Sequence, residues 1–109
     1  MWVSVLVGHL ALVSCGEVKS QSERMTAVQA ALQVGMSKRQ VLEVAGAPSR
    51  LESGDRLETR CREKQGKEQM FYDYQGRLAW GWLGTSHVGI LIVCIDQAES
   101  VVWVDRIVF

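Results

Sequence analysis

The chain has no excess of either charge and only short hydrophobic runs, and each shortage excludes a class of protein. Twelve Lys and Arg residues balance twelve Asp and Glu residues in a chain of 109, so there is no net positive field of the kind that non-specific nucleic-acid binding requires. The longest strongly apolar stretch, residues 2–13, has about twelve residues, whereas a membrane-spanning helix needs about 20. We therefore expect one small domain with no nucleic-acid partner and no spanning helix.

Residues that commonly carry catalysis are also scarce. Of two histidines, one lies in the apolar N-terminal stretch, which leaves His87 for any triad in the mature domain. A nucleophile elbow reads Gly-x-Ser-x-Gly, and after Ser86 the second glycine position holds Val88. Cys61, His87 and Cys94 lack the spacing of a zinc site, and no glycine-rich phosphate loop is present. We expect no enzymatic activity, no metal site and no cofactor.

The N-terminal residues have the composition of a secretory signal peptide. Residues 1–14 contain no Asp, Glu, Lys or Arg, and the chain becomes polar after Gly16, as at a cleavage site. Leu, Val and a small residue precede Cys15, a pattern that resembles the lipobox of bacterial lipoproteins, in which the cysteine is acylated and becomes the first residue. This resemblance implies a signal peptide over 1–14, a lipidated tether over 15–21 and, because Gly16 is not Asp, an outer-membrane location.

The alternative is that residues 2–13 form a buried first strand or helix and that Cys15 is an ordinary cysteine. If Cys15 is acylated, Cys61 and Cys94 are the only possible pair, and the compartment outside the inner membrane is oxidising. A disulfide that closes a loop of about 33 residues would stabilise the fold by about 3 to 4 kcal/mol. Alternatively, Cys94 is a small buried hydrophobe and Cys61 is exposed and free. Neither has the Cys-x-x-Cys spacing of a redox site.

Apolar residues three and four positions apart predict a first helix between Ser22 and Gly35. A second helix is marked by its ends: Ser37 and Gln40 have capping-box spacing, and Gly46 followed by Pro48 ends it. Met36 and Val41 are spaced as a hydrophobic staple. The predicted apolar face of this helix consists of Val41, Leu42, Val44 and Ala45. With almost no linker between them, the two helices should form a hairpin.

The rest of the chain is typical of strands. We predict that the charged residues 54–68 form an exposed strand or loop closed by a turn at Gln65-Gly66, and that Gln75-Gly76 is a turn and 84–89 a loop. The predicted strands are 70–74, 78–83, 88–95 and 101–109. The last two are apolar on both faces, so we expect them at the centre of the sheet. The fold class is α+β, a two-helix hairpin packed on a small antiparallel sheet of three to four strands.

The second helix and its flanks carry a family resemblance. Gly35-Met36-Ser37, Gln40-Val41 and Gly46-Ala47-Pro48 resemble the signature of the SmpA/OmlA family of small outer-membrane lipoproteins, which includes BamE-like and OsmE-like proteins. The resemblance implies a domain over 22–109 on the periplasmic face of the cell outer membrane. It further implies a binding module that supports outer-membrane protein assembly or envelope integrity through protein contacts, with the β-barrel assembly machinery as a possible partner and outer-membrane lipid bound through acylated Cys15. The alternative is an OsmE-like or inhibitor-like envelope stress lipoprotein that binds a single partner.

Three tryptophans are candidates for partner contacts, because tryptophan is enriched at interface hot spots. They are Trp80, Trp82 and Trp103. The alternative for each is packing in the core.

Overall fold

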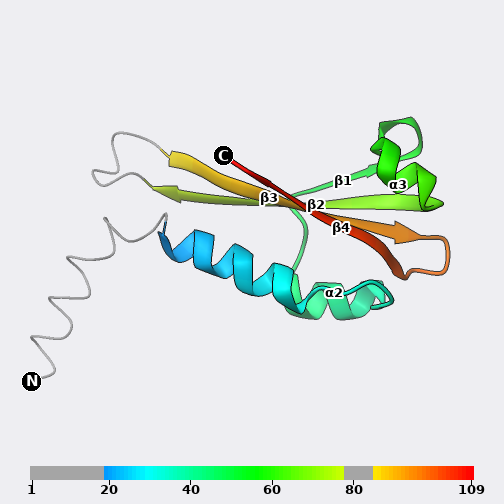
Figure 1. Ribbon diagram of the computed structural model, residues 1–109, viewed down its shortest axis with the longest axis horizontal. Helices are drawn as coiled ribbons and strands as arrows, with labels where there is room; N and C mark the ends of the chain where they lie inside the picture. Colours follow the sequence, from blue (N-terminus) through cyan, green and yellow to red (C-terminus); the bar gives the residue numbers. More distant parts are fainter. Residues whose placement is uncertain (1–18, 78–84) are drawn as a thin grey trace, which may run out of the picture.

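The computed structural model describes residues 19–77 and 85–109. In chain order they form helix α1 (residues 19–31), α2 (Lys38–Ala45), strand β1 (Arg50–Ser53), the 3-10 turn η1 (Gly54–Arg56), α3 (Thr59–Glu63), β2 (Gly66–Arg77), β3 (Thr85–Asp96) and β4 (Val101–Val108). The strands form one antiparallel sheet in the order β1-β2-β3-β4. Helices α1 and α2 lie along one side of it, and α3 lies at the far end on the other side (Figure 1). The predicted α+β class is confirmed.

The main core lies between the sheet and the first two helices. Because successive strand side chains point to opposite faces, every second residue of the central strands meets the helices. The buried residues of this core come from α1, the connection after it, α2 and three strands: Met25, Leu32, Val41, Met70, Tyr72, Tyr74, Val88, Leu91, Val93, Ile95 and Val101. The alternation in β2 and β3 therefore assigns one sheet face to the helices and leaves the other for α3.

Helix α2 begins and ends where its capping residues predict. The Gln40 N–H donates to Ser37 Oγ over 3.1 Å, and the Ser37 N–H donates to Gln40 Oε1 over 2.9 Å, which completes the capping box. Gly46 has a φ of 80° and donates its N–H to the Leu42 carbonyl over 2.9 Å. The predicted apolar face is too wide, however. Val41 is buried, but Leu42 and Val44 are 39% and 41% exposed, because only one side of this two-turn helix reaches the sheet.

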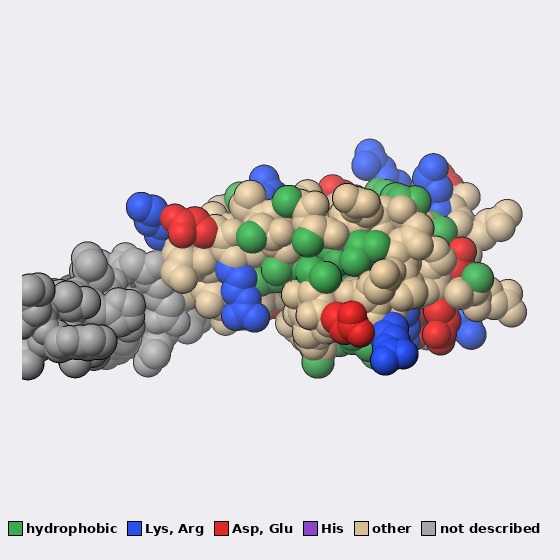
Figure 2. Space-filling model, turned by 90° about the horizontal axis from the view of Figure 1, so that it is seen from below, with side chains coloured by type: hydrophobic (Ala, Val, Ile, Leu, Met, Phe, Trp, Pro, Cys, Tyr) green, Lys and Arg blue, Asp and Glu red, His purple; other side chains and the backbone are tan. Residues whose placement is uncertain are grey.

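The surface seen from the helix side carries apolar side chains among charged ones (Figure 2). Met25 of α1 and Leu32, just after the helix, face inward and belong to the core. The predicted start at Ser22 is wrong, since residues 19–21 are already helical and the Ser22 carbonyl accepts a hydrogen bond from the Thr26 hydroxyl one turn later. Gly35 has the predicted left-handed backbone, with φ 99°.

The strand boundaries differ from the prediction in three places. Residues 50–53 form β1, which was not predicted. Gln75-Gly76 is not a turn, because both residues continue β2 and pair with His87 and Ser86 of β3, next to a register shift after Tyr74. Such a β-bulge accommodates one extra residue in a strand pair without ending the pairing. Residues 85–87 therefore belong to β3 and not to a loop. The predicted strand 78–83 lies outside the described residues.

The expected position of the last two strands is only half right. β3 is central, between β2 and β4, but β4 is an edge strand and β2 is the second central one. Apolar residues on both faces did not distinguish a central strand from an edge strand here, because the outer face of β4 is covered locally by packing of Val102 and Trp103 against the α3 cluster.

Tyr72 connects the sheet to the end of α2. Its hydroxyl donates a 2.8 Å hydrogen bond to the Gly46 carbonyl, and its side chain is buried in the main core. Burial disfavours the phenolate and raises the pKa of Tyr72 to about 12. A tyrosine in the unfolded chain has a pKa of about 10, so the folded state favours the neutral form of Tyr72.

We expect Tyr72→Phe to lower the free energy of unfolding by about 1 kcal/mol at neutral pH, the usual net value of one hydrogen bond. Because the folded-state pKa is raised, the stability that depends on neutral Tyr72 is complete below pH about 10 and is lost as the pH rises toward about 12. The deficit of Tyr72→Phe relative to wild type should therefore shrink across this window in urea unfolding, measured in a Cys15→Ser background to avoid thiol exchange. A deficit that does not change with pH would contradict this assignment.

Candidate functional site

The most distinctive site joins the charged segment to the central strand. Cys61 of α3 and Cys94 of β3 form a disulfide with a Cα–Cα distance of 5.6 Å, and both residues are fully buried. The predicted disulfide is confirmed, and the expectation that Cys61 is exposed and free is wrong. Leu57 and Cys61 lie four residues apart and both face the sheet. The neighbours of Cys61 on either side, Arg60 and Arg62, are exposed. The mixed charge of the segment hid this short buried stripe.

Gly66 makes this close packing possible. It follows Gln65, whose φ of 62° makes the predicted turn, and it opens β2. A Cβ at Gly66 would lie 2.3 Å from each disulfide sulfur and 2.8 Å from the Cys61 carbonyl oxygen. Real atoms do not approach so closely, so no larger residue fits here without displacing the disulfide.

Gln69 fixes the start of α3. Its side chain is completely buried, and its Oε1 accepts a 2.8 Å hydrogen bond from the Glu58 N–H, which is the N-cap residue of α3. The helix thus receives its first hydrogen bond from the sheet and not from a capping side chain of its own. Gln69 was not singled out in the sequence, since a polar residue in a strand looks like a solvent-facing position until the covering segment is known.

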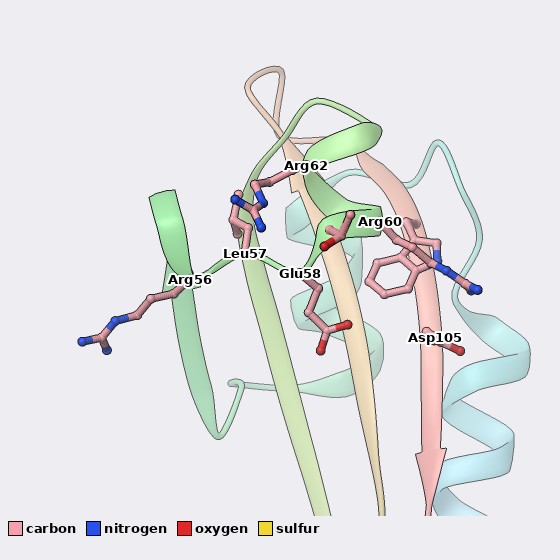
Figure 3. Close-up of a pocket in the computed structure, with 8 residues that line it drawn as sticks. Arg56, Leu57, Glu58, Arg60, Arg62 and Asp105 are labelled. Atoms are coloured by element: carbon pink, nitrogen blue, oxygen red, sulfur yellow. The ribbon is translucent and has the colours of Figure 1, made fainter.

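A shallow cavity of about 460 Å³ lies between this segment and β4. Its lining residues come from η1, α3 and β4: Arg56, Leu57, Glu58, Thr59, Arg60, Arg62, Trp103 and Asp105. Figure 3 shows Arg56 extending away from the others, whereas Arg60 extends over β4 on the side of Asp105. The arginines diverge, so the cavity is not built around one anion. It offers an apolar floor with charged side chains of both signs at its edges.

Trp103 supplies part of that floor. It is half-buried and packs against the cluster of Leu57, Cys61 and Cys94, while its remaining surface lines the cavity. The packing considered for Trp103 is therefore observed in part, and its contact with a partner stays a prediction. Trp80, Trp82 and Cys15 lie outside the described residues.

Beyond the cavity, the same sheet face carries polar pairs. Arg50 of β1 lies 4.1 Å above the centre of the Phe71 ring, within the range of a cation–π contact. At the other end, His87 Nδ1 lies 3.6 Å from Asp73 Oδ1, and its ring is 5.8 Å from that of Phe109. His87 is thus an exposed residue near the start of β3 that lies close to a carboxylate.

The predicted motif residues have structural roles: Gly35 and Met36 pair with β4, Ser37 and Gln40 cap α2, Val41 lies in the core, and Gly46 ends α2 two residues before Pro48. Over residues 19–77 and 85–109, no three His, Cys, Asp or Glu side chains are grouped to hold a metal ion. In the same residues, no helix is long and apolar enough to cross a membrane.

No protein-family model, curated protein or solved structure matches this chain.

Substitution of Gly66 tests the packing around the disulfide. We expect Gly66→Ala to lower the free energy of unfolding by about 1 to 3 kcal/mol, as overpacking does, or to leave Cys61 and Cys94 reduced, since the new methyl group would overlap both sulfurs. Urea unfolding and thiol counting in denaturant measure the two effects.

The same change in a Cys61→Ala, Cys94→Ala background provides the control. There the sulfurs are absent, so most of the extra cost should disappear, as a double-mutant cycle would report. An equal cost in both backgrounds would show that the disulfide is not what requires glycine at this position.

Proposed function

We propose that this protein is a lipid-anchored module at the periplasmic face of the outer membrane, where it binds another protein. The observation that carries the proposal is the buried Cys61–Cys94 disulfide. Disulfides of this structural kind form and persist in oxidising compartments. The chain has three cysteines, and the pairing of two leaves Cys15, at the position that resembles a lipobox, for acylation.

The position of α1 supports this anchor. Four peptide bonds separate Cys15 from Lys19, and an extended chain covers at most about 3.6 Å per residue, so residue 19 would lie within about 14 Å of the lipidated cysteine. This end of α1 lies at the opposite end of the molecule from α3 (Figure 1). The cavity beside α3 would therefore face away from the bilayer, where a partner protein can reach it.

The composition of the cavity fits a protein partner. Tryptophan and arginine are the residues most enriched at interface hot spots, and Trp103, Arg60 and Arg62 all line this cavity. Its shallow shape and mixed charge suit a protein surface better than an enclosed small molecule. The family resemblance adds the proposed role, support of outer-membrane protein assembly or envelope integrity, with the β-barrel assembly machinery as partner.

Palmitate labelling tests the anchor. We expect radiolabelled palmitate to enter the wild-type protein and to be found with the outer membrane after fractionation. Cys15→Ser should abolish the label, whereas Cys61→Ser should keep it, because only Cys15 has the lipobox context. If none of the three proteins is labelled, residues 1–14 belong to the folded domain and the proposed location is wrong.

Charge reversal tests the partner surface. We expect Arg60→Glu to reduce cross-linking to barrel-assembly subunits at least about tenfold, the effect of losing a hot-spot residue. Arg39→Glu is the matched control, since Arg39 is also exposed but lies on α2, where Glu43 is its only ion-pair partner among the described residues. Equal recovery with both variants would rule out the cavity as the contact surface.

A further inference from the structure

The outer edge of β4 carries backbone groups that no strand of the described residues pairs with. Near its end, the Phe109 N–H donates to the Val88 carbonyl of β3, so the backbone groups of Phe109 point toward β3. In an antiparallel pair this direction alternates along a strand. The N–H and C=O groups of Val104, Arg106 and Val108 therefore point away from the sheet.

The first part of this edge is already occupied. The Gly35 N–H donates to the Val101 carbonyl and the Val101 N–H donates to the Met36 carbonyl, both over 2.8 Å. Ser37 forms an antiparallel bridge with Ser100. The α1–α2 connection thus acts as a short added strand, and it shows that this edge binds an extended backbone where one is offered. The free part is Val104–Val108, which we call the open edge.

The Asp105 side chain occupies a backbone donor in the middle of the open edge. Asp105 Oδ1 accepts a 2.8 Å hydrogen bond from the Arg106 N–H, which otherwise would be free to pair with another chain. Charged residues at an edge are a common protection against unwanted strand addition. The other edge, β1, is short and carries the Arg50–Glu52–Arg56 ion pairs. The open edge in contrast ends in Ile107 and Val108, which are 42% and 60% exposed.

Pairing of two copies through this edge is disfavoured in three registers. The register that pairs Arg106 with Val108 sets no like charges opposite each other, so the test below includes the oligomeric state of the unliganded chain. When Val104 of one copy pairs with Arg106 of the other in an antiparallel arrangement, the two Asp105 residues lie opposite each other. Pairing of Arg106 with itself sets two guanidinium groups opposite each other, and like charges directly opposite are destabilising. Pairing of Val104 with itself brings the second copy onto Val101, where Gly35 and Met36 already bind.

We propose that the open edge accepts an antiparallel strand of another protein, one with a basic residue opposite Asp105 and an acidic residue opposite Arg106. Such a strand has the order acidic-basic, with β-branched residues opposite Val104 and Val108. The backbone of this strand replaces the Asp105 carboxylate as the acceptor of the Arg106 N–H. The basic side chain of the strand then pairs with the displaced carboxylate. This inference deepens the proposed function, since it states how a partner is bound. It does not depend on the lipid anchor.

The probe is an acetylated, amidated peptide, Val-Thr-Glu-Lys-Val-Thr, which places Glu opposite Arg106 and Lys opposite Asp105. The matched control, Val-Thr-Lys-Glu-Val-Thr, has the same composition with the charged pair reversed. Each peptide is titrated into the oxidised full chain carrying Cys15→Ser, and backbone amide NMR signals are followed. We expect the signals of Val104 and Val108 to shift and those of Leu51 and Ser53, on the β1 edge, to stay unchanged.

Two cross-strand ion pairs are each worth about 0.2 to 1 kcal/mol, so the control peptide should bind at least about threefold more weakly. In the double variant Asp105→Arg, Arg106→Asp, the preference between the two peptides should be reversed. Absence of shifts at Val104 and Val108, equal affinity for both peptides, or a dimer of the unliganded chain in sedimentation would each overturn the proposal. Because lipid labelling is not a readout here, failure of this test leaves the proposed anchor and location to be judged separately.

Discussion

The bond between Cys61 and Cys94 is the constraint on which one whole side of this protein depends. The segment between β1 and β2 buries only Leu57 and Cys61, and α3 has five residues, far fewer than a helix needs to be stable by itself in water. The disulfide attaches this segment to a central strand, Gly66 leaves room for the two sulfurs, and Gln69 bonds the first residue of the helix. The cavity and the position of Trp103 follow from that attachment.

The two faces of the sheet are therefore stabilised in different ways. On one face, α1 and α2 bury a continuous apolar core, and the Tyr72 hydroxyl joins that core to the end of α2. On the other, a covalent bond replaces most of the apolar area that a longer helix would supply. A small domain with a modest core commonly needs such a crosslink. Structural disulfides persist in oxidising compartments, which is why the proposed location rests on this bond.

The two edges of the sheet also differ in how they are covered. β1 is short and charged, whereas β4 has one part covered by the α1–α2 connection and one part open. Together with the cavity, this places two surfaces suitable for protein contacts along β4, on which Trp103 and Asp105 both lie. The proposed binding role needs only such surfaces, and the location of the two along one strand allows a single partner to reach both.

The sequence by itself determined what depends on neighbouring residues. The ends of α2, the turn at Gln65-Gly66 and the α+β order of elements were predicted, because caps and turns need only local information. The choice of Cys61 and Cys94 as partners was predicted from the lipobox resemblance, which assigns Cys15 to acylation and leaves the other two cysteines. Only the tertiary structure decided that β4 is an edge strand, that Leu57 and Cys61 are buried, and that Gln69 bonds Glu58. Each of these depends on which segments lie together across the sheet, and mixed charge or two-sided apolarity in one segment is compatible with more than one such neighbour.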